Sequence, residues 1–275
     1  MANYVSSLAK TEAVVRPENT VVKASKLEGE LPEAPDDERW VSTEPTSFLL
    51  VPQIIAAERF FTPSNDTITV RAMYNDDEMA FLLEWDDRTK SIPGDEKAEK
   101  IADDDIAEDA VAIQLPVKLP DGAEKPYFLM GDAVHPVNLW RWKSGTTDVP
   151  ASVVLMTGRG LEDIETRDAA AVGIRALGGY EAGTWRVVIK RPLTTSDPEQ
   201  DIQFVEGAFI PVAFAAWDGS NSESGTRHTL TTWYWLLLKP ASGNTPLLAA
   251  LAAFVLVLLA EIAWARSASR KIRSA

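Results

Sequence analysis

The chain of 275 residues contains no cysteine. This absence excludes disulfides, thiolate sites for zinc or iron–sulfur clusters, a cysteine nucleophile and covalent haem attachment. Histidine is scarce too, because His135 and His228 are the only two and neither lies in an H-E-x-x-H pattern. Any redox chemistry of this chain therefore needs a cofactor that is held without cysteine.

The sequence also lacks the motifs of the common catalytic classes. It has no G-x-S-x-G, no Walker loop and no G-x-G-x-x-G, so serine hydrolase, P-loop and dinucleotide-binding functions have no support. Carboxylate pairs such as Asp86 and Asp87 arise by chance in an acidic chain, and adjacent residues of a strand point to opposite faces rather than flanking one cleft. An autonomous hydrolase is the class that the sequence supports least.

Excess positive charge is confined to the C-terminal end of the chain. The formal net charge is -14, and residues 241–275 carry one acid and four bases, a sum of +3, so residues 1–240 carry -17. A body this acidic repels phosphate backbones, which argues against nucleic-acid binding and favours basic protein partners.

One long apolar run lies near the C-terminus, over residues 247–265, with Glu261 as its only charged residue. Its length suits a hydrocarbon core of roughly 30 Å, and a basic tail follows at 266–275. We therefore predict a single transmembrane helix over 247–265, with a cytoplasmic tail and an extracytoplasmic body. The N-terminal sequence does not resemble a Sec signal peptide, so this orientation would require export together with a signal-bearing partner.

Composition divides the rest of the chain. Residues 1–45 mix proline and acids with few large apolar groups, which predicts an extended arm that packs on a partner. A body over 46–240 follows, and residues 241–246 form a short hinge before the anchor. The charge-rich stretch at 94–109 is more typical of a solvated loop than of a cation site.

The body is predicted to be mainly β. Trp185, Val187 and Ile189 alternate with more polar neighbours, which is the period of a half-buried strand. Many short strands without a long amphipathic helix indicate an antiparallel β-sandwich. Further strands are predicted at 67–74, 78–87, 109–117, 137–142, 152–157, 202–217 and 229–238, with hairpins at 73–81 and 172–189.

Nine tryptophans give the body an aromatic character. In a β-sandwich such residues form the core, a platform for sugars, or the wall of a pocket for a flat cofactor, and the core is the default. The informative segments are 126–142 and 215–236, because they combine aromatic residues with methionine or histidine.

These segments resemble a known family. FLMG followed by VNLWRWK, then GTWRVVIKRPL, then WDGSN with the downstream TWYWL, is similar to the haem b-binding gamma subunit of ethylbenzene dehydrogenase and its relatives. These are the third subunits of the type II dimethyl sulfoxide reductase family, which includes chlorate reductase, dimethyl sulfide dehydrogenase and some nitrate and nitrite oxidoreductases. The resemblance covers roughly residues 45–238 and implies a β-sandwich around one noncovalent haem b.

The resemblance implies a methionine and a lysine as the axial ligands of that haem. By position the methionine is Met130, whereas His228 occupies the place of the lysine. Neutral imidazole is a common haem ligand, so the replacement is chemically sound. His135 is the reserve ligand, although its place before Pro136 favours a turn. Without the resemblance, Met130 would be a core residue and His228 a strand residue at the surface.

Other residues are candidates for contacts with the haem. Trp140 and Trp217 are candidate walls of the pocket, and Arg191, Arg227 and Lys190 are candidate partners of the propionates, with a solvated surface charge as the alternative for each cation. Arg227 is not expected to bind iron directly, because a guanidinium stays protonated.

The resemblance and the anchor together predict a membrane-anchored b-type cytochrome subunit that relays single electrons and is not an enzyme by itself. Its partners would be molybdenum and iron–sulfur subunits, or a quinol-oxidising cytochrome complex, in the cell membrane. Two alternatives remain open: a carbohydrate-binding module with exposed tryptophans, and an assembly subunit that retains the fold without haem.

Overall fold

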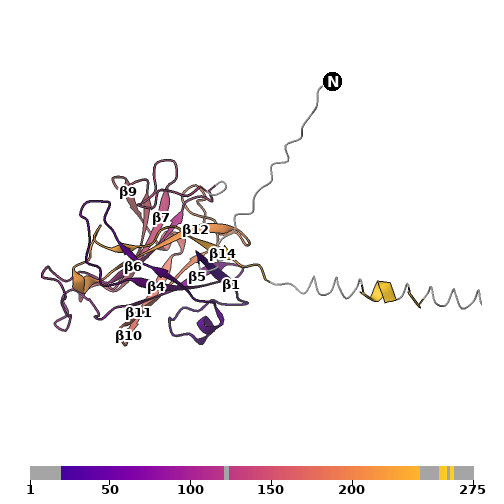
Figure 1. The fold of residues 1–275 in the computed structure, drawn as a ribbon, viewed down its shortest axis with the longest axis horizontal. Coiled ribbons are helices and arrows are strands. Elements are labelled where there is room, and N and C mark those ends of the chain that lie inside the picture. Colours follow the sequence, from indigo (N-terminus) through magenta and orange to yellow (C-terminus); the bar gives the residue numbers. More distant parts are fainter. Residues whose placement is uncertain (1–19, 121–123, 242–253, 259–260, 263–275) are drawn as a thin grey trace, which may run out of the picture. The chain divides into compact units, whose positions relative to one another are not determined.

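A computed structural model describes residues 20–120, 124–241, 254–258 and 261–262 of the chain. Contacts divide the chain into two units, with the boundary between Lys239 and Pro240. Over its described residues the first unit is mainly β, with a few short 3-10 segments (Figure 1). The fold class predicted from sequence is confirmed for this unit at the level of a mainly β, sandwich-like architecture.

The strands follow the alternation of the sequence closely, and their bounds are β1 Val21–Lys26, β2 Thr46–Leu49, β3 Val51–Pro52, β4 Thr67–Tyr74, β5 Glu78–Asp86, β6 Ala110–Pro116, β7 Val137–Lys143, β8 Ser152–Gly158, β9 Ile164–Arg167, β10 Arg175–Glu181, β11 Thr184–Pro192, β12 Phe209–Trp217, β13 Thr229–Leu230 and β14 Tyr234–Leu238. The 3-10 segments are η2 Glu38–Ser42, η3 Ala170–Val172 and η4 Gly219–Asn221.

Both predicted hairpins are confirmed, as β4–β5 and β10–β11. The strand predicted over 202–217 is wrong in its first part, because a turn at Gly207, with φ of 80°, precedes β12.

Hydrogen bonds link the strands in the order β10-β11-β5-β4-β1-β14-β12-β6-β7-β8-β9. The pairing is antiparallel except at β1, which lies parallel to both β4 and β14. The segment predicted as an extended arm therefore contributes a strand between β4 and β14, and this parallel junction departs from the purely antiparallel sheet that the sequence suggested.

The two ends of this strand order form two layers around one core. Phe81 and Trp85 on β5 meet Trp140 and Trp142 on β7 edge to face, with ring centroids 6.2 and 6.5 Å apart. These aromatic residues are buried together with the aliphatic inward faces of β6, β11 and β12. Side chains alternate along each strand, so the opposite face of β6, β7 and β12 is free to form something other than core.

In the second unit, residues 254–258 and 261–262 are helical and exposed. No helix within the ranges that the structure describes is long and apolar enough to cross a membrane. Most of the anchor predicted over 247–265 lies outside the described residues, as does the tail at 266–275.

Candidate cofactor cavity

A cavity lies on the outward face of the β12-β6-β7-β8 layer, and Ala213 and Ala215 of β12 are among the residues that line it. Ala110 and Ala112 on β6, and Ala213 and Ala215 on β12, point to this face, while their neighbours point to the core. Across the sheet, Ala215 lies beside Ala112, which in turn lies beside Arg141. Alanine occupies little volume above a sheet, so Ala213 and Ala215 leave space over β12.

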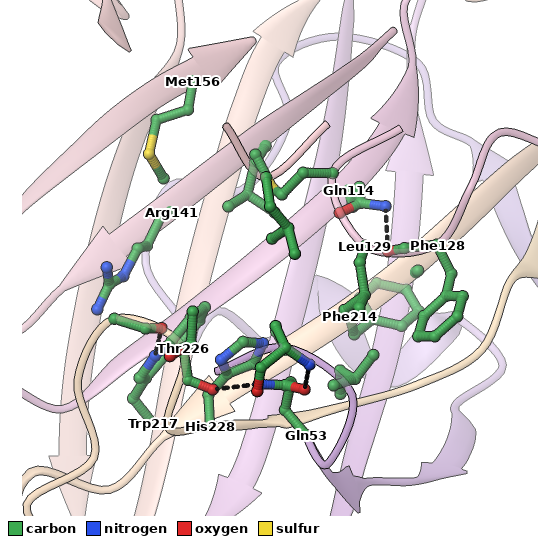
Figure 2. A pocket seen from close by; sticks show the side chains of 18 of the residues that line it. Gln53, Gln114, Phe128, Leu129, Arg141, Met156, Phe214, Trp217, Thr226 and His228 are labelled. Carbon is green, nitrogen blue, oxygen red and sulfur yellow. Dashed lines mark hydrogen bonds between the residues drawn. The ribbon is translucent and has the colours of Figure 1, made fainter. Parts of the chain in front are cut away.

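Three loops build the walls of this cavity. One is the turn at 128–130, another is the segment 53–56, and the last is 225–231, which leads into β13. Gln53 joins two of them, since its amide donates to the carbonyls of Ala56 and Thr226 at 3.2 and 3.0 Å and its Oε1 accepts from two backbone N–H groups. Figure 2 shows Arg141 and Trp217 on one side of the pocket, and Phe128 and Leu129 on the other.

The cavity has a volume of about 240 Å³ and is open to solvent at its mouth. Its lining is apolar apart from two glutamines, two threonines, His228 and Arg141, and Arg141 is the one formally charged residue among the described residues that line it. Such a cavity suits an apolar group that carries an acidic substituent.

Met130 lines the cavity from the turn at 128–130. Its φ is 62° and that of Gly131 is 68°, a tight left-handed pair that directs the chain back towards β7. The Met130 carbonyl accepts from the Gly160 N–H at 2.9 Å. Gly158 makes room for this turn, because a Cβ there would lie 2.8 Å from Met130 Cε and 2.7 Å from its carbonyl oxygen.

His228 lines the same cavity from the segment before β13. Its ring stacks on Trp217, with centroids 4.6 Å apart and planes 28° apart. Burial, and after it the charge of Arg141, lowers the pKa of His228 to about 4, so the imidazole is neutral at pH 7. Its Nδ1 is buried and finds no hydrogen-bond partner in the described part of the chain. His228 is therefore a neutral nitrogen donor beside an apolar space.

Arg141 extends from β7 into the cavity wall. Its guanidinium carbon lies 4.2 Å from the centroid of the Trp217 ring, a cation–π arrangement. Trp217 itself is fixed by a hydrogen bond from Nε1 to the Gly225 carbonyl at 3.1 Å. Arg141, Trp217 and His228 thus form one contiguous group in the wall.

Of the site residues predicted from sequence, the structure brings Met130, His228 and Trp217 together and places the others elsewhere. Trp140 is fully buried on the core face of β7, because it alternates with Leu139 and Arg141. His135 lies in a turn in which its N–H and that of Val134 donate to Asp132. The turn expected for His135 is confirmed.

The three predicted propionate partners do not line the cavity. Arg191 is buried in the core, 4.6 Å from the Phe204 ring centroid. Lys190 is buried as well and donates to the Leu31 carbonyl at 3.1 Å. Arg227 is partly exposed and pairs with Asp104 at 3.1 Å. The solvated surface charge offered as their alternative also fails for Arg191 and Lys190, because both are buried. Arg191 lies on the core face of β11, and Lys190 lies on the opposite face beside Leu31.

Sequence reasoning missed Arg141, Gln53 and Met156, all of which line the cavity. A signal for Arg141 was available, since VNLWRWK alternates and places Leu139 and Arg141 on the face opposite Trp140 and Trp142. For Met156 the signal is the pairing register of β7 and β8, which places it beside Leu139. Gln53 had no local signal, because its role depends on a loop far away in the sequence.

Comparison with known proteins adds to this geometry. The family model for ethylbenzene dehydrogenase matches residues 37–169 and 150–229. A Haloferax mediterranei protein described as a respiratory nitrate reductase haem subunit is 25% identical over 88% of this chain and 81% of its own length. The chlorate reductase gamma subunit of Ideonella dechloratans is 28% identical over 64% of this chain and 66% of its own length.

Among solved structures, a family 9 carbohydrate-binding module from Caldicellulosiruptor kristjanssonii, in complex with glucose, superposes with a TM-score of 0.45. It is 14% identical, over 82% of this chain and 98% of the module. At this level of overlap the likeness carries no argument about function.

Proposed function

Because the chain belongs to the ethylbenzene dehydrogenase family, we propose that it is a membrane-anchored b-type cytochrome subunit that relays single electrons within a respiratory oxidoreductase complex. Two of its relatives are named as a haem subunit and as a gamma subunit of reductases. The observation that carries the proposal is that Met130 and His228, which are far apart in the sequence, line one apolar cavity.

The residues of the cavity fit haem b. Thioether and neutral imidazole are established axial ligands of haem iron, and the cavity offers one methionine from a tight turn and a histidine that is neutral at pH 7. Ala213 and Ala215 of β12 contribute small side chains to the cavity, and most of its lining is apolar. Haem b supplies a reversible one-electron couple when it is bound. In this role Met130 and His228 would hold the iron.

Two methionines in the same cavity allow a matched test of this proposal. In Met130→Leu we expect loss of the six-coordinate low-spin signal, or loss of the haem, because a ligand is removed. In Met156→Leu we expect the wild-type spectrum, because the substitution removes a sulfur that does not bind the iron. His228→Leu should behave like Met130→Leu. Visible spectra of the purified full chain, oxidised and reduced, check all three.

The ligand assignment would be overturned if Met130→Leu kept the wild-type low-spin spectrum and full haem content. If Met156→Leu lost the low-spin spectrum instead, the sulfur ligand would be Met156 on β8. A wild-type protein that carries no haem would overturn the function itself.

The membrane part of the proposal depends on composition. The apolar run at 247–265 and the basic tail at 266–275 favour a single-pass anchor with a cytoplasmic tail and the acidic body on the extracytoplasmic side. The partners would be molybdenum and iron–sulfur subunits or a quinol-oxidising cytochrome. Protease treatment of intact spheroplasts tests the orientation, and we expect digestion of the body.

A further inference from the structure

The cavity contains a positive charge that the protein leaves unbalanced. Within the described part of the chain, Arg141 forms no salt bridge and its Nε is buried without a hydrogen-bond partner. Burial lowers its pKa, and Glu108, whose charge acts on it, forms its ion pair with Lys143 instead. A half-buried guanidinium whose Nε has lost water without gaining an acceptor is costly.

We propose that Arg141 binds a carboxylate of the ligand in this cavity, namely one propionate of haem b. This inference rests on the proposed function, since it takes the ligand to be a haem. It assigns to Arg141 the role that the sequence had suggested for Arg191, Arg227 or Lys190.

The surroundings of Arg141 select a carboxylate as its partner. A guanidinium presents its N–H groups in a planar fork that matches a carboxylate with two parallel hydrogen bonds. The ring of Trp217 covers one face of the guanidinium at 4.2 Å, so the N–H edge remains for an acceptor. The lining contains no aspartate or glutamate among the described residues, so the acceptor must come with the ligand.

The other cations near this face are already paired. Lys143 lies on the same face of β7 and pairs with Glu108, and Arg227 pairs with Asp104. Neither of them lines the cavity. Lys143→Gln is therefore a matched control: it removes one positive charge from the same strand face and leaves the cavity wall intact.

The test compares two probes on the haem-free full chain: iron protoporphyrin IX and its dimethyl ester, in which both propionates are neutral. The ratio of their dissociation constants is measured by Soret titration in wild type, Arg141→Gln, Arg141→Lys and Lys143→Gln. We expect wild type to bind the free acid about ten- to a hundredfold more tightly than the ester, the range for a hydrogen-bonded charged pair. Arg141→Gln should abolish this preference, Arg141→Lys should keep part of it, and Lys143→Gln should keep it in full.

The ratio is taken within each variant, so a general loss of folding or affinity in Arg141→Gln cancels. An undiminished preference in Arg141→Gln overturns the inference. Equal binding of both probes by wild type, with a low-spin spectrum, also overturns it while the cytochrome function stands. Failure of wild type to bind either probe overturns the proposed function instead.

Discussion

Gly158 determines where Met130 can lie. A Cβ at this position would meet the carbonyl oxygen of Met130 at 2.7 Å and its Cε at 2.8 Å. In Gly158→Ala we expect the turn at 128–130 to move away from β8, at a cost of about 1–3 kcal/mol for overpacking, and haem binding to weaken although both ligands are present. Haem content and the Soret titration of the purified variant check this.

Gly179→Ala provides the control, because a Cβ there meets nothing within 4 Å. We expect this variant to bind haem like wild type. Equal haem affinity in Gly158→Ala and wild type would contradict the role assigned to Gly158.

Asp87 makes the stability of the body depend on pH. Oxygens of its carboxyl and those of Asp109 and Asp218 lie within 4.8 Å of one another, and all three residues are buried. Burial, followed by the negative charges of the other two, raises the pKa of Asp87 to about 8. Between about pH 4 and 8 the folded chain keeps a proton that the unfolded chain has released, so stability falls as the pH rises.

Asp87→Asn removes this ionisation, so we expect the variant to lose less stability than wild type between pH 5 and pH 8.5. Urea unfolding at both pH values measures the difference. Asp86→Asn, at the exposed neighbouring position, should retain the wild-type dependence. An Asp87→Asn variant with the same pH dependence as wild type would contradict the raised pKa.

At the residue scale, the sequence predicted some of the site and missed the rest for a physical reason. Met130, His228 and Trp217 follow from the resemblance, and the cavity brings them together. Trp140 and Arg141 are neighbours in the same strand, and only the face of each decides whether it reaches the core or the cavity. Motif spacing contains no information on that face, whereas strand alternation does.

At the element scale, β1 and β14 connect the two layers. Leu236 on β14 lies beside Val22 on β1 and Ile210 on β12, and all three are fully buried. Leu236→Ala should cost about 2–5 kcal/mol of unfolding free energy, because it leaves a cavity at this junction. Val41→Ala, at a position 83% exposed, should change stability by less than about 0.5 kcal/mol.

Urea unfolding of both variants tests the junction. Similar stabilities for Leu236→Ala and wild type would show that β1 and β14 contribute little to the fold.

Strands with clear alternation or a continuous apolar run could be predicted, and β4, β5, β6, β7 and β8 lie where the sequence placed them. The place of β1 could not, because its partners β4 and β14 lie far along the chain and a parallel pair leaves no hairpin signal. Long-range pairing of this kind is decided by packing of the whole sheet, which short windows of sequence do not contain.

At the scale of the whole molecule, the proposed anchor predicts how the chain distributes between membrane and solution. Leu256→Arg combined with Val257→Arg places two charges in the apolar run, each costing about 2.5–3.5 kcal/mol at the centre of a span. We expect this variant to leave the membrane pellet after a carbonate wash. Ser267→Arg combined with Ser269→Arg adds the same charge to the basic tail and should leave the chain in the pellet, as for wild type.

An unchanged membrane fraction for the Leu256 and Val257 variant would contradict the anchor. The proposal of a haem in the cavity is independent of this result, because the described residues that line the cavity all precede Lys239.

We propose above all that the body of this protein binds one haem b between Met130 and His228. The most direct measurement is the reduced-minus-oxidised visible spectrum of the detergent-purified full chain, with a pyridine haemochromogen assay on the same sample. We expect a six-coordinate low-spin b-type spectrum with one haem per chain. A blank spectrum from fully assembled protein, or a high-spin haem with an open axial position, would contradict it.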